Sequence, residues 1–378
     1  MKRPDFLEAF ARHRGGAPTI TGPGLMTREL FAATGEDPTI LYNMEMPYAT
    51  AMCLGLAMAR PMQRIVALEG DGSLISALGI LTTMARHRQP NLTLIVLDNA
   101  SYSTFGAGMI SATAAGVDLA AVARGCGLDR TLSVTTLAQA ETALPRVLRE
   151  DGPWVLIAKV EPQGEPDPRF ARNSPDVMEQ ALDFARMLRR SAASAGTPRN
   201  ARPTPPGMSA SHRYDVARIF ADSLKTNGIA LSVMLPDSVL HPLNELLLAD
   251  ATVATVSCSR EDEGIAIAAG AGWGGWRSAV SMEGSAIGMS GLILARAAIQ
   301  RSPTLILASH TTVLGERFGY HAATRAVTQP VLDALRIPYH VLRDADEIPH
   351  VVKRIVQTME GQKIPAAILV PPFILMAD

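Results

Sequence analysis

Short runs of apolar, mostly β-branched residues alternate with longer amphipathic segments along most of this 378-residue chain. In the first half, residues 65–68 and 92–97 are typical of buried strands, and four apolar residues recur between them at helical spacing: Leu74, Leu78, Leu81 and Ala85. In the second half, five runs predict strands, at residues 229–234, 253–258, 279–282, 304–308 and 366–370. Helical patterns fill the gaps, including residues 264–272 and 290–300. This alternation predicts an α/β protein with two doubly wound parallel-sheet domains.

One segment interrupts the alternation. Residues 190–212 show no hydrophobic periodicity and are rich in Ala, Ser and Pro, which is typical of an extended connector. We therefore expect a first domain at residues 1–189, a linker at 190–212 and a second domain at 213–378. Just before the linker, Ser174 and Pro175 suit the N-cap and first position of a helix that ends near Arg190.

Composition excludes several classes of protein. Hydrophobic residues make up 47% of the chain, which rules out a disordered polymer, and 35 basic against 36 acidic residues leave no net attraction to nucleic acid. The three cysteines, Cys53, Cys126 and Cys258, are too far apart in sequence for a zinc motif or a disulfide framework. No apolar run is long enough to span a membrane and no secretory signal is evident, so we expect a cytoplasmic protein.

The first half carries a polar motif after a predicted strand. Gly70-Asp71-Gly72-Ser73 follows residues 65–68, and Asn99 follows the next strand, 28 residues after Asp71. Neighbouring parallel strands bring such residues together at one edge of a sheet. Carboxylate, amide and carbonyl oxygens there suit a Mg²⁺ ion that keeps phosphate oxygens as further ligands. The alternative is an ordinary turn, with Asn99 as a loop cap.

This stretch resembles the diphosphate-binding motif of thiamine diphosphate enzymes, which begins with Gly-Asp-Gly and ends in Asn. The resemblance implies that Asp71, Asn99 and the Ser101 carbonyl hold Mg²⁺. It also implies contacts between the cofactor and the Gly70–Ser73 turn, that is, Gly70, Asp71, Gly72 and Ser73. Upstream, Met46 matches the bulky apolar residue that supports the cofactor's two rings in a V shape. The alternative for Met46 is an ordinary core methionine.

A second polar site follows residues 253–258, where Glu261, Asp262 and Glu263 precede a helix of small apolar residues. Three carboxylates there would simply favour a helix N-terminus. By resemblance, Glu261 matches the cofactor-activating glutamate, because it lies nine residues before Gly270 in such a helix. This role implies that the Glu261 carboxyl shares a proton with the pyrimidine ring of the cofactor.

Two further catalytic positions follow predicted strands of the second half. By resemblance, Asp237 matches a position where related decarboxylases carry active-site polar residues, and would relay a proton. In a Pro-Asp-Ser turn, however, an aspartate is as often a helix cap. His310 either faces the active-site cleft or caps a loop. Downstream, Arg317 and His321 are candidates for binding an anionic substrate tail.

The resemblance covers nearly the whole chain and is nearest to the sulfopyruvate and phosphonopyruvate decarboxylases. It implies non-oxidative decarboxylation of a small 2-oxo acid to an aldehyde. It also implies a homodimer or larger homo-oligomer in which a diphosphate-type and a pyrimidine-type domain share each site. Here the diphosphate-type half comes first, and Thr311 stands where relatives often have Arg, which leaves the substrate open. Two alternatives remain: a carboligase that forms an acyloin, and a catalytically silent cofactor-binding subunit.

Overall fold

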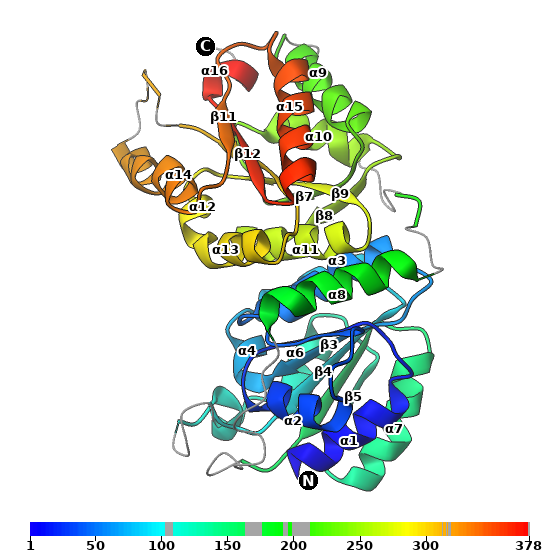
Figure 1. Cartoon of the computed structure of the whole chain (residues 1–378). Helices are drawn as coiled ribbons and strands as arrows, with labels where there is room; N and C mark the ends of the chain where they lie inside the picture. Colours follow the sequence, from blue (N-terminus) through cyan, green and yellow to red (C-terminus); the bar gives the residue numbers. More distant parts are fainter. Residues whose placement is uncertain are drawn as a thin grey trace. The chain divides into compact units, whose positions relative to one another are not determined.

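A computed structural model describes residues 1–102, 109–162, 176–191, 196–198, 212–311, 313–314, 316 and 319–376 (Figure 1). The chain divides into two compact units, Met1–Gly196 and Thr197–Asp378, and each is described here by itself. Most of the predicted linker, residues 190–212, lies outside the described residues; helix α8 runs to Arg190 and α9 begins at His212. Among the described residues, no helix is long and apolar enough to cross a membrane.

The first unit contains a six-stranded parallel sheet with the order β2-β1-β3-β4-β6-β5. Its strands are β1 (Thr19–Thr21), β2 (Ile40–Leu41), β3 (Ile65–Gly70), β4 (Leu92–Asp98), β5 (Thr131–Val134) and β6 (Trp154–Lys159). Its α-helices are α1 (Arg3–His13), α2 (Leu25–Thr34), α3 (Tyr48–Ala59), α4 (Asp71–Ile75), α5 (Gly79–His87), α6 (Leu119–Gly125), α7 (Leu137–Arg149) and α8 (Val177–Arg190). A short 3-10 helix, η2, spans Ala112–Ala115. Figure 1 shows α1 and α2 on one side of this sheet and α3 on the other.

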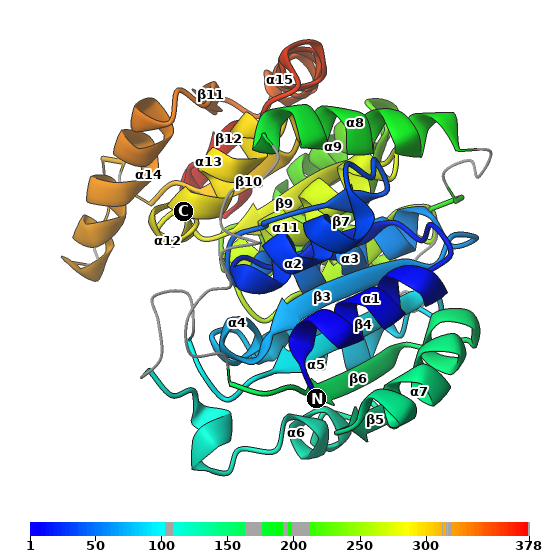
Figure 2. The same ribbon diagram turned by 60° about the horizontal axis from the view of Figure 1, so that its bottom comes forward.

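The second unit contains another six-stranded parallel sheet, with the order β11-β12-β10-β9-β7-β8. Its strands are β7 (Ile229–Met234), β8 (Ala254–Ser257), β9 (Arg277–Met282), β10 (Leu305–Ser309), β11 (Tyr339–Val341) and β12 (Ala366–Val370). Its α-helices are α9 (His212–Thr226), α10 (His241–Ala249), α11 (Glu261–Trp273), α12 (Ala286–Met289), α13 (Gly291–Ile299), α14 (Ala322–Ala334), α15 (Ile348–Gln362) and α16 (Pro372–Leu375). Figure 2 gives a second view of these elements.

The two sheets have the same strand order. Numbered from the first strand of its own unit, each sheet reads 2-1-3-4-6-5. The order reverses between β1 and β3 in the first unit and between β7 and β9 in the second. In doubly wound sheets, ligands bind beyond the carboxyl ends of the strands at such a reversal. The predicted fold class, two doubly wound parallel sheets, is therefore confirmed, and its topology indicates where each unit would bind a ligand.

One predicted helical pattern is divided between two helices, and one predicted N-cap was wrong. The helical spacing from Leu74 to Ala85 belongs to two helices, α4 and α5, because i to i+3 hydrogen bonds replace the α-helical pattern between them, including the one from the Ala77 N–H to the Leu74 carbonyl (3.1 Å). The N-cap of α8 is Asp176, whose Oδ1 accepts the Met178 and Glu179 N–H groups at 2.8 and 3.0 Å. The predicted cap residues Ser174 and Pro175 lie outside the described residues.

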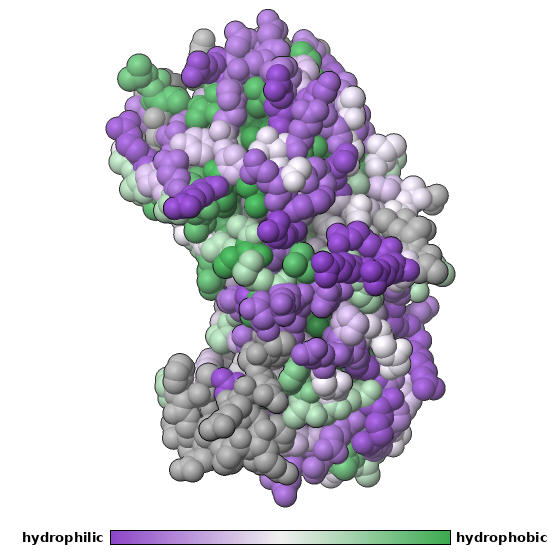
Figure 3. Space-filling view, viewed as in Figure 1, coloured by the Kyte–Doolittle hydropathy of each residue, from purple (hydrophilic) through white to green (hydrophobic). Residues whose placement is uncertain are grey.

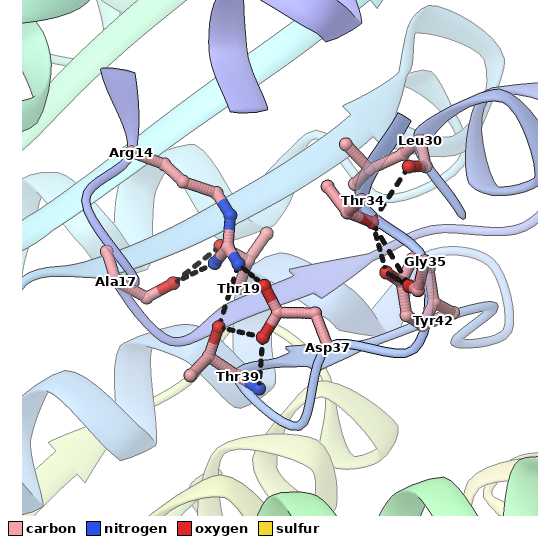
Figure 4. A network of polar contacts seen from close by, with 9 residues as sticks. All are labelled: Arg14, Ala17, Thr19, Leu30, Thr34, Gly35, Asp37, Thr39 and Tyr42. Carbon is pink, nitrogen blue, oxygen red and sulfur yellow. Dashed lines mark hydrogen bonds and ion pairs between the residues drawn. The ribbon is translucent and has the colours of Figure 1, made fainter. Parts of the chain in front are cut away.

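A polar network fastens the end of α1 to the chain before β2 (Figure 4). The Arg14 guanidinium forms an ion pair with Asp37 and donates to Thr39 Oγ1 at 2.8 Å. Burial raises the pKa of Asp37, but the hydrogen bonds from Thr39 and the charge of Arg14 outweigh it, so the net pKa is lowered. Nearby, Thr34 Oγ1 and the Tyr42 hydroxyl lie 2.6 Å apart. This network holds the edge strand β2, which has only two residues.

Candidate functional site

The predicted residues of the first unit meet at the carboxyl edge of its sheet. Strand β3 runs into α4 through the Gly70–Ser73 turn, and β4 is followed by Asn99 and Ser101. A small cavity of about 80 Å³ lies there. Seven predicted residues line it: Met46, Gly70, Asp71, Gly72, Ser73, Asn99 and Ser101. Residues that are far apart in sequence thus come together where β3 and β4 end.

Asp71 is the buried carboxylate of this cavity, with 1% of its surface exposed. It accepts hydrogen bonds from Ser111 and from Thr113 Oγ1, the latter at 2.9 Å. Burial raises the pKa of Asp71, although these hydrogen bonds act in the opposite direction. Thr113 Oγ1 also lies 2.8 Å from Asp98 Oδ1, and Asp98 pairs with Lys159. The Asp71 side chain is therefore held in place from the segment after β4.

The oxygen atoms around Asp71 fit a magnesium ion. Asn99 Oδ1 accepts the Ser101 N–H at 3.2 Å, so the amide and the following backbone form one tight loop beside the carboxylate. Among the described residues, no three His, Cys, Asp or Glu side chains are grouped to hold a metal. One carboxylate with amide and backbone oxygens suits a cation that keeps phosphate and water ligands, and does not suit zinc.

A buried ion pair stands at the rim of the same cavity. Arg3, from the first turn of α1, lines the cavity. Its guanidinium donates to both carboxylate oxygens of Glu29 in α2, at 2.6 and 2.8 Å. The two side chains are 6% and 1% exposed. Sequence reasoning missed this pair, because the partners lie 26 residues apart with no shared motif.

The second unit places Glu261 at the start of α11, after β8. Its two acidic neighbours are buried and paired: Asp262 accepts from Arg260 at 2.7 and 3.0 Å, and Glu263 accepts from Ser259 at 2.5 Å. Glu261 is partly exposed, and its carboxylate makes no side-chain hydrogen bond or ion pair with another described residue. Of the three carboxylates, Glu261 is therefore the one that remains available to a ligand.

Asp237 lies beyond β7 and has two kinds of partner. Its Oδ1 accepts the Leu240 N–H at 2.9 Å, as a turn cap does, and its Oδ2 accepts Ser309 Oγ from the end of β10 at 3.0 Å. Burial raises the pKa of Asp237. His310 is 5% exposed, and burial lowers the pKa of its imidazole. Both residues thus follow strands, β7 and β10, that lie on either side of β9, and burial shifts the pKa of each.

Sequence reasoning missed a second carboxylate at this edge. Glu283 directly follows β9, the strand between β7 and β10, and accepts the Ser285 N–H at 2.9 Å and Thr324 Oγ1 at 3.3 Å. Burial raises its pKa, and the charge of Asp237 raises it further. The signal was available, since an acidic residue directly follows the predicted strand at residues 279–282.

Of the two candidates for a substrate's anionic tail, only one is described. His321 Nδ1 lies 2.8 Å from a carboxylate oxygen of Glu316, and Arg317 lies outside the described residues.

Two other surface features contain none of the predicted site residues. A larger cavity of about 670 Å³ lies in the first unit between α8 and the chain before β2, and its lining includes the acidic residues Glu36, Asp37 and Asp183 and the basic residues Arg186 and Arg190. Hydrophilic residues cover most of the face of the molecule drawn in Figure 3. Exposed apolar side chains on α12 and α13 include Met289 and Leu292.

Comparison with known proteins identifies the family of the first unit. Residues 29–158 match the family described as thiamine pyrophosphate enzyme, C-terminal TPP binding domain; thiamine pyrophosphate is another name for thiamine diphosphate. The matched segment contains the whole Gly70–Ser73 turn as well as Met46, Asn99 and Ser101.

Several decarboxylases are similar to parts of the chain. Sulfopyruvate decarboxylase subunit beta of Methanocaldococcus jannaschii is 28% identical over 165 residues, which are 43% of this chain and 86% of that protein. Subunit alpha from Methanothermobacter thermautotrophicus is 30% identical over 136 residues, 36% of this chain and 82% of that protein. Phosphonopyruvate decarboxylase of Streptomyces viridochromogenes is 31% identical over 164 residues, which span 42% of this chain but only 41% of that protein.

Solved structures share the fold at low sequence identity. Transketolase from Campylobacter jejuni has a TM-score of 0.60 at 12% identity, covering 98% of this chain and 77% of that chain. Benzoylformate decarboxylase from Polynucleobacter necessarius has a TM-score of 0.54 at 10% identity, covering 98% of both chains. Together with the sequence relatives, these likenesses confirm the resemblance: the chain belongs to the thiamine diphosphate-dependent enzyme family, in the group that contains the sulfopyruvate and phosphonopyruvate decarboxylases.

Proposed function

We propose that this protein uses thiamine diphosphate and Mg²⁺ to decarboxylate a short 2-oxo acid, similar to phosphonopyruvate or sulfopyruvate, without oxidation. One observation carries the proposal: the six residues expected around the diphosphate and Mg²⁺, together with Met46, line one cavity in the first unit. In the reaction, the bond between the carboxyl and carbonyl carbons breaks, CO₂ leaves, and a proton takes its place to give an aldehyde. When bound, thiamine diphosphate supplies the nucleophilic carbon and accepts the electron pair released with CO₂.

The residues of the first unit would bind and orient the cofactor. Asp71, Asn99 and the Ser101 carbonyl would hold Mg²⁺, and the metal would neutralise the diphosphate. The backbone of Gly70 and of Gly72 would approach the phosphates closely. A side chain at Gly72 would meet Tyr102, since an added Cβ lies only 2.3 Å from Tyr102 Cε1.

Met46, 39% exposed at the same cavity, would support the two rings of the cofactor in a V shape.

The residues of the second unit would handle protons. Glu261 would hold a proton against the pyrimidine ring nitrogen, a role that suits a carboxylate with no side-chain hydrogen bond or ion pair to another described residue. Asp237 and His310 would deliver the proton that replaces CO₂. A carboxyl with a raised pKa retains a proton closer to neutral pH, which suits a proton donor.

The direct test measures CO₂ release from phosphonopyruvate, sulfopyruvate and pyruvate, with and without thiamine diphosphate and Mg²⁺. We expect release from at least one of them that depends on both additions, with the aldehyde as product. Glu261→Gln should lower the rate by about 10² to 10⁴-fold while the cofactor still binds, the range for loss of a general acid or base. Glu263→Gln is the matched control, because its carboxylate is already bonded to Ser259. Equal activity in both variants would contradict the assignment.

We also propose a homodimer or larger homo-oligomer in which the sites are shared between chains. Relatives of this chain include both an alpha and a beta subunit of sulfopyruvate decarboxylase, each similar to less than half of it. Mixing inactive Asp71→Ala and Glu261→Ala chains under conditions of subunit exchange tests this. In a shared-site dimer, half of the molecules are mixed and each has one intact site, so activity should recover to about a quarter of normal. Sites built within one chain would recover none.

A further inference from the structure

A buried carboxylate lies directly beneath the proposed diphosphate turn. Glu69 is the residue before Gly70 in strand β3, and only 1% of its surface is exposed. The rest of that strand is apolar up to this point: Ile65, Val66, Ala67 and Leu68. A charge placed there is costly unless hydrogen bonds satisfy it. Its partners therefore show what the residue does.

Glu69 joins two elements of the cofactor cavity. Its Oε1 accepts the Thr50 N–H at 3.0 Å and the Thr50 hydroxyl at 3.1 Å. Thr50 lies in the first turn of α3, just after the loop that carries Met46. The other oxygen, Oε2, accepts the Ser73 hydroxyl at 2.6 Å. One carboxylate thus connects the methionine side of the cavity to the diphosphate turn.

The surrounding chain leaves room for this carboxylate. A Cβ atom at Gly22, after strand β1, would lie 2.7 Å from Glu69 Oε2 and 3.2 Å from Met26 Cε. Any larger residue at position 22 would push the carboxylate away from Ser73. Gly22, Glu69 and Ser73 therefore form one packed arrangement.

In this arrangement, the Ser73 hydroxyl donates its only proton to Glu69. A serine hydroxyl has one O–H donor, and a carboxylate can only accept. Since that proton points to Glu69, the hydroxyl cannot also donate to a phosphate oxygen. We infer that Glu69 is a positioning residue that turns the Ser73 hydroxyl away from the cofactor, so that Ser73 contacts the diphosphate through its backbone N–H. The inference rests on the proposed use of thiamine diphosphate.

Glutamine at position 69 reverses the direction of this hydrogen bond. In Glu69→Gln, the amide oxygen can still accept from Thr50, while the amide nitrogen donates to Ser73 Oγ. The Ser73 proton is then free to turn toward the diphosphate. The side-chain hydroxyl should contribute to cofactor affinity only in this variant.

The experiment is a double-mutant cycle on the full chain, with the Kd of thiamine diphosphate measured by calorimetry in saturating Mg²⁺. In the native background, Ser73→Ala should change Kd by less than about threefold while lowering the melting temperature, because Glu69 loses a partner. In the Glu69→Gln background, the same change should weaken binding by about tenfold or more, as expected for loss of a hydrogen bond to a charged group. The matched control is Ser76→Ala, which removes a hydroxyl that donates to the Ser73 carbonyl at 2.8 Å. This variant should leave the Kd of thiamine diphosphate unchanged in both backgrounds.

Failure of the inference is distinct from failure of the proposed function. If the native chain binds no thiamine diphosphate, the proposed function is wrong. If it binds, a tenfold weaker Kd in Ser73→Ala with Glu69 present, or equal effects in both backgrounds, would overturn the inference. Should Glu69→Gln not fold, the comparison of Ser73→Ala with Ser76→Ala in the native background decides the matter alone.

Discussion

The buried ion pair between Arg3 and Glu29 allows a quantitative test of how this fold supports its cofactor cavity. Glu29→Gln removes one charge and leaves the Arg3 guanidinium in a site that is only 6% exposed. Truncating one partner of a buried pair costs about 3 to 5 kcal/mol, because the other charge stays desolvated. The bidentate geometry, 2.6 and 2.8 Å, places this pair toward the upper part of that range.

The measurement needs a signal from the first unit alone. The chain has three tryptophans: Trp154 in the first unit, and Trp273 and Trp276 in the second. Replacing Trp273 and Trp276 by Phe leaves Trp154 as the fluorescent reporter during urea unfolding. With a loss of about 3 to 5 kcal/mol and a urea dependence of about 2 to 3 kcal/mol/M, the midpoint should fall by about 1 to 2.5 M.

Two further variants test the reasoning. Asp183→Asn breaks an ion pair of the same chemistry with Arg186, but that pair is more than half exposed and should contribute less than about 1 kcal/mol. Replacing Arg3 and Glu29 together by Leu should cost much less than Glu29→Gln, because no unpaired charge remains. A midpoint shift for Glu29→Gln no larger than that for Asp183→Asn would refute the reasoning.

Three other predictions follow from single residues. Hydrogen bonds and Arg14 hold the pKa of Asp37 below its ordinary 3.8, so its stabilising contribution is present above that pH and lost below it. Asp37→Asn should therefore lower the melting temperature at pH 7, with the difference from the native chain closing as the pH falls below 3.8. Burial raises the pKa of Asp237, and the sign is opposite: ionisation destabilises the fold above pH 3.8, so Asp237→Asn should melt higher at pH 7 while losing decarboxylase activity. Met46→Ala should change stability by less than about 1 kcal/mol, because the side chain is 39% exposed, yet weaken cofactor-dependent turnover; unchanged turnover would remove Met46 from the site.

Much of the fold was predictable because its central strands are long and apolar. The patterns at residues 65–68 and 92–97 correspond to β3 and β4, which are buried along nearly their whole length. Strand β1 and the edge strand β2 have three and two residues, too few for any periodicity to be detected. Hydrogen bonds such as those from Arg14, which link distant segments, complete that edge.

The site was predictable to the extent that its residues share a motif. Asp71 and Asn99 are separated by two short helices and one strand, and because β3 and β4 are neighbouring parallel strands, topology brings them to one edge. Ser111 donates a hydrogen bond to Asp71 from 40 residues away, and no local sequence pattern predicts that contact. Glu69 and Glu283 had a visible signal, an acid directly after a predicted strand. What the sequence could not supply was their partners, which depend on how helices fold back over the sheet.

The repeated strand order has a consequence for the evolution of such chains. Each sheet takes all six of its strands from one unbroken stretch of polypeptide, so no strand of one unit depends on the other. Joining the units in either order, or encoding them as two genes, therefore leaves both sheets topologically intact. The segment that matches a domain described as C-terminal here occupies residues 29–158, near the start of the chain. Gene order in this family can thus be shuffled without redesigning either sheet.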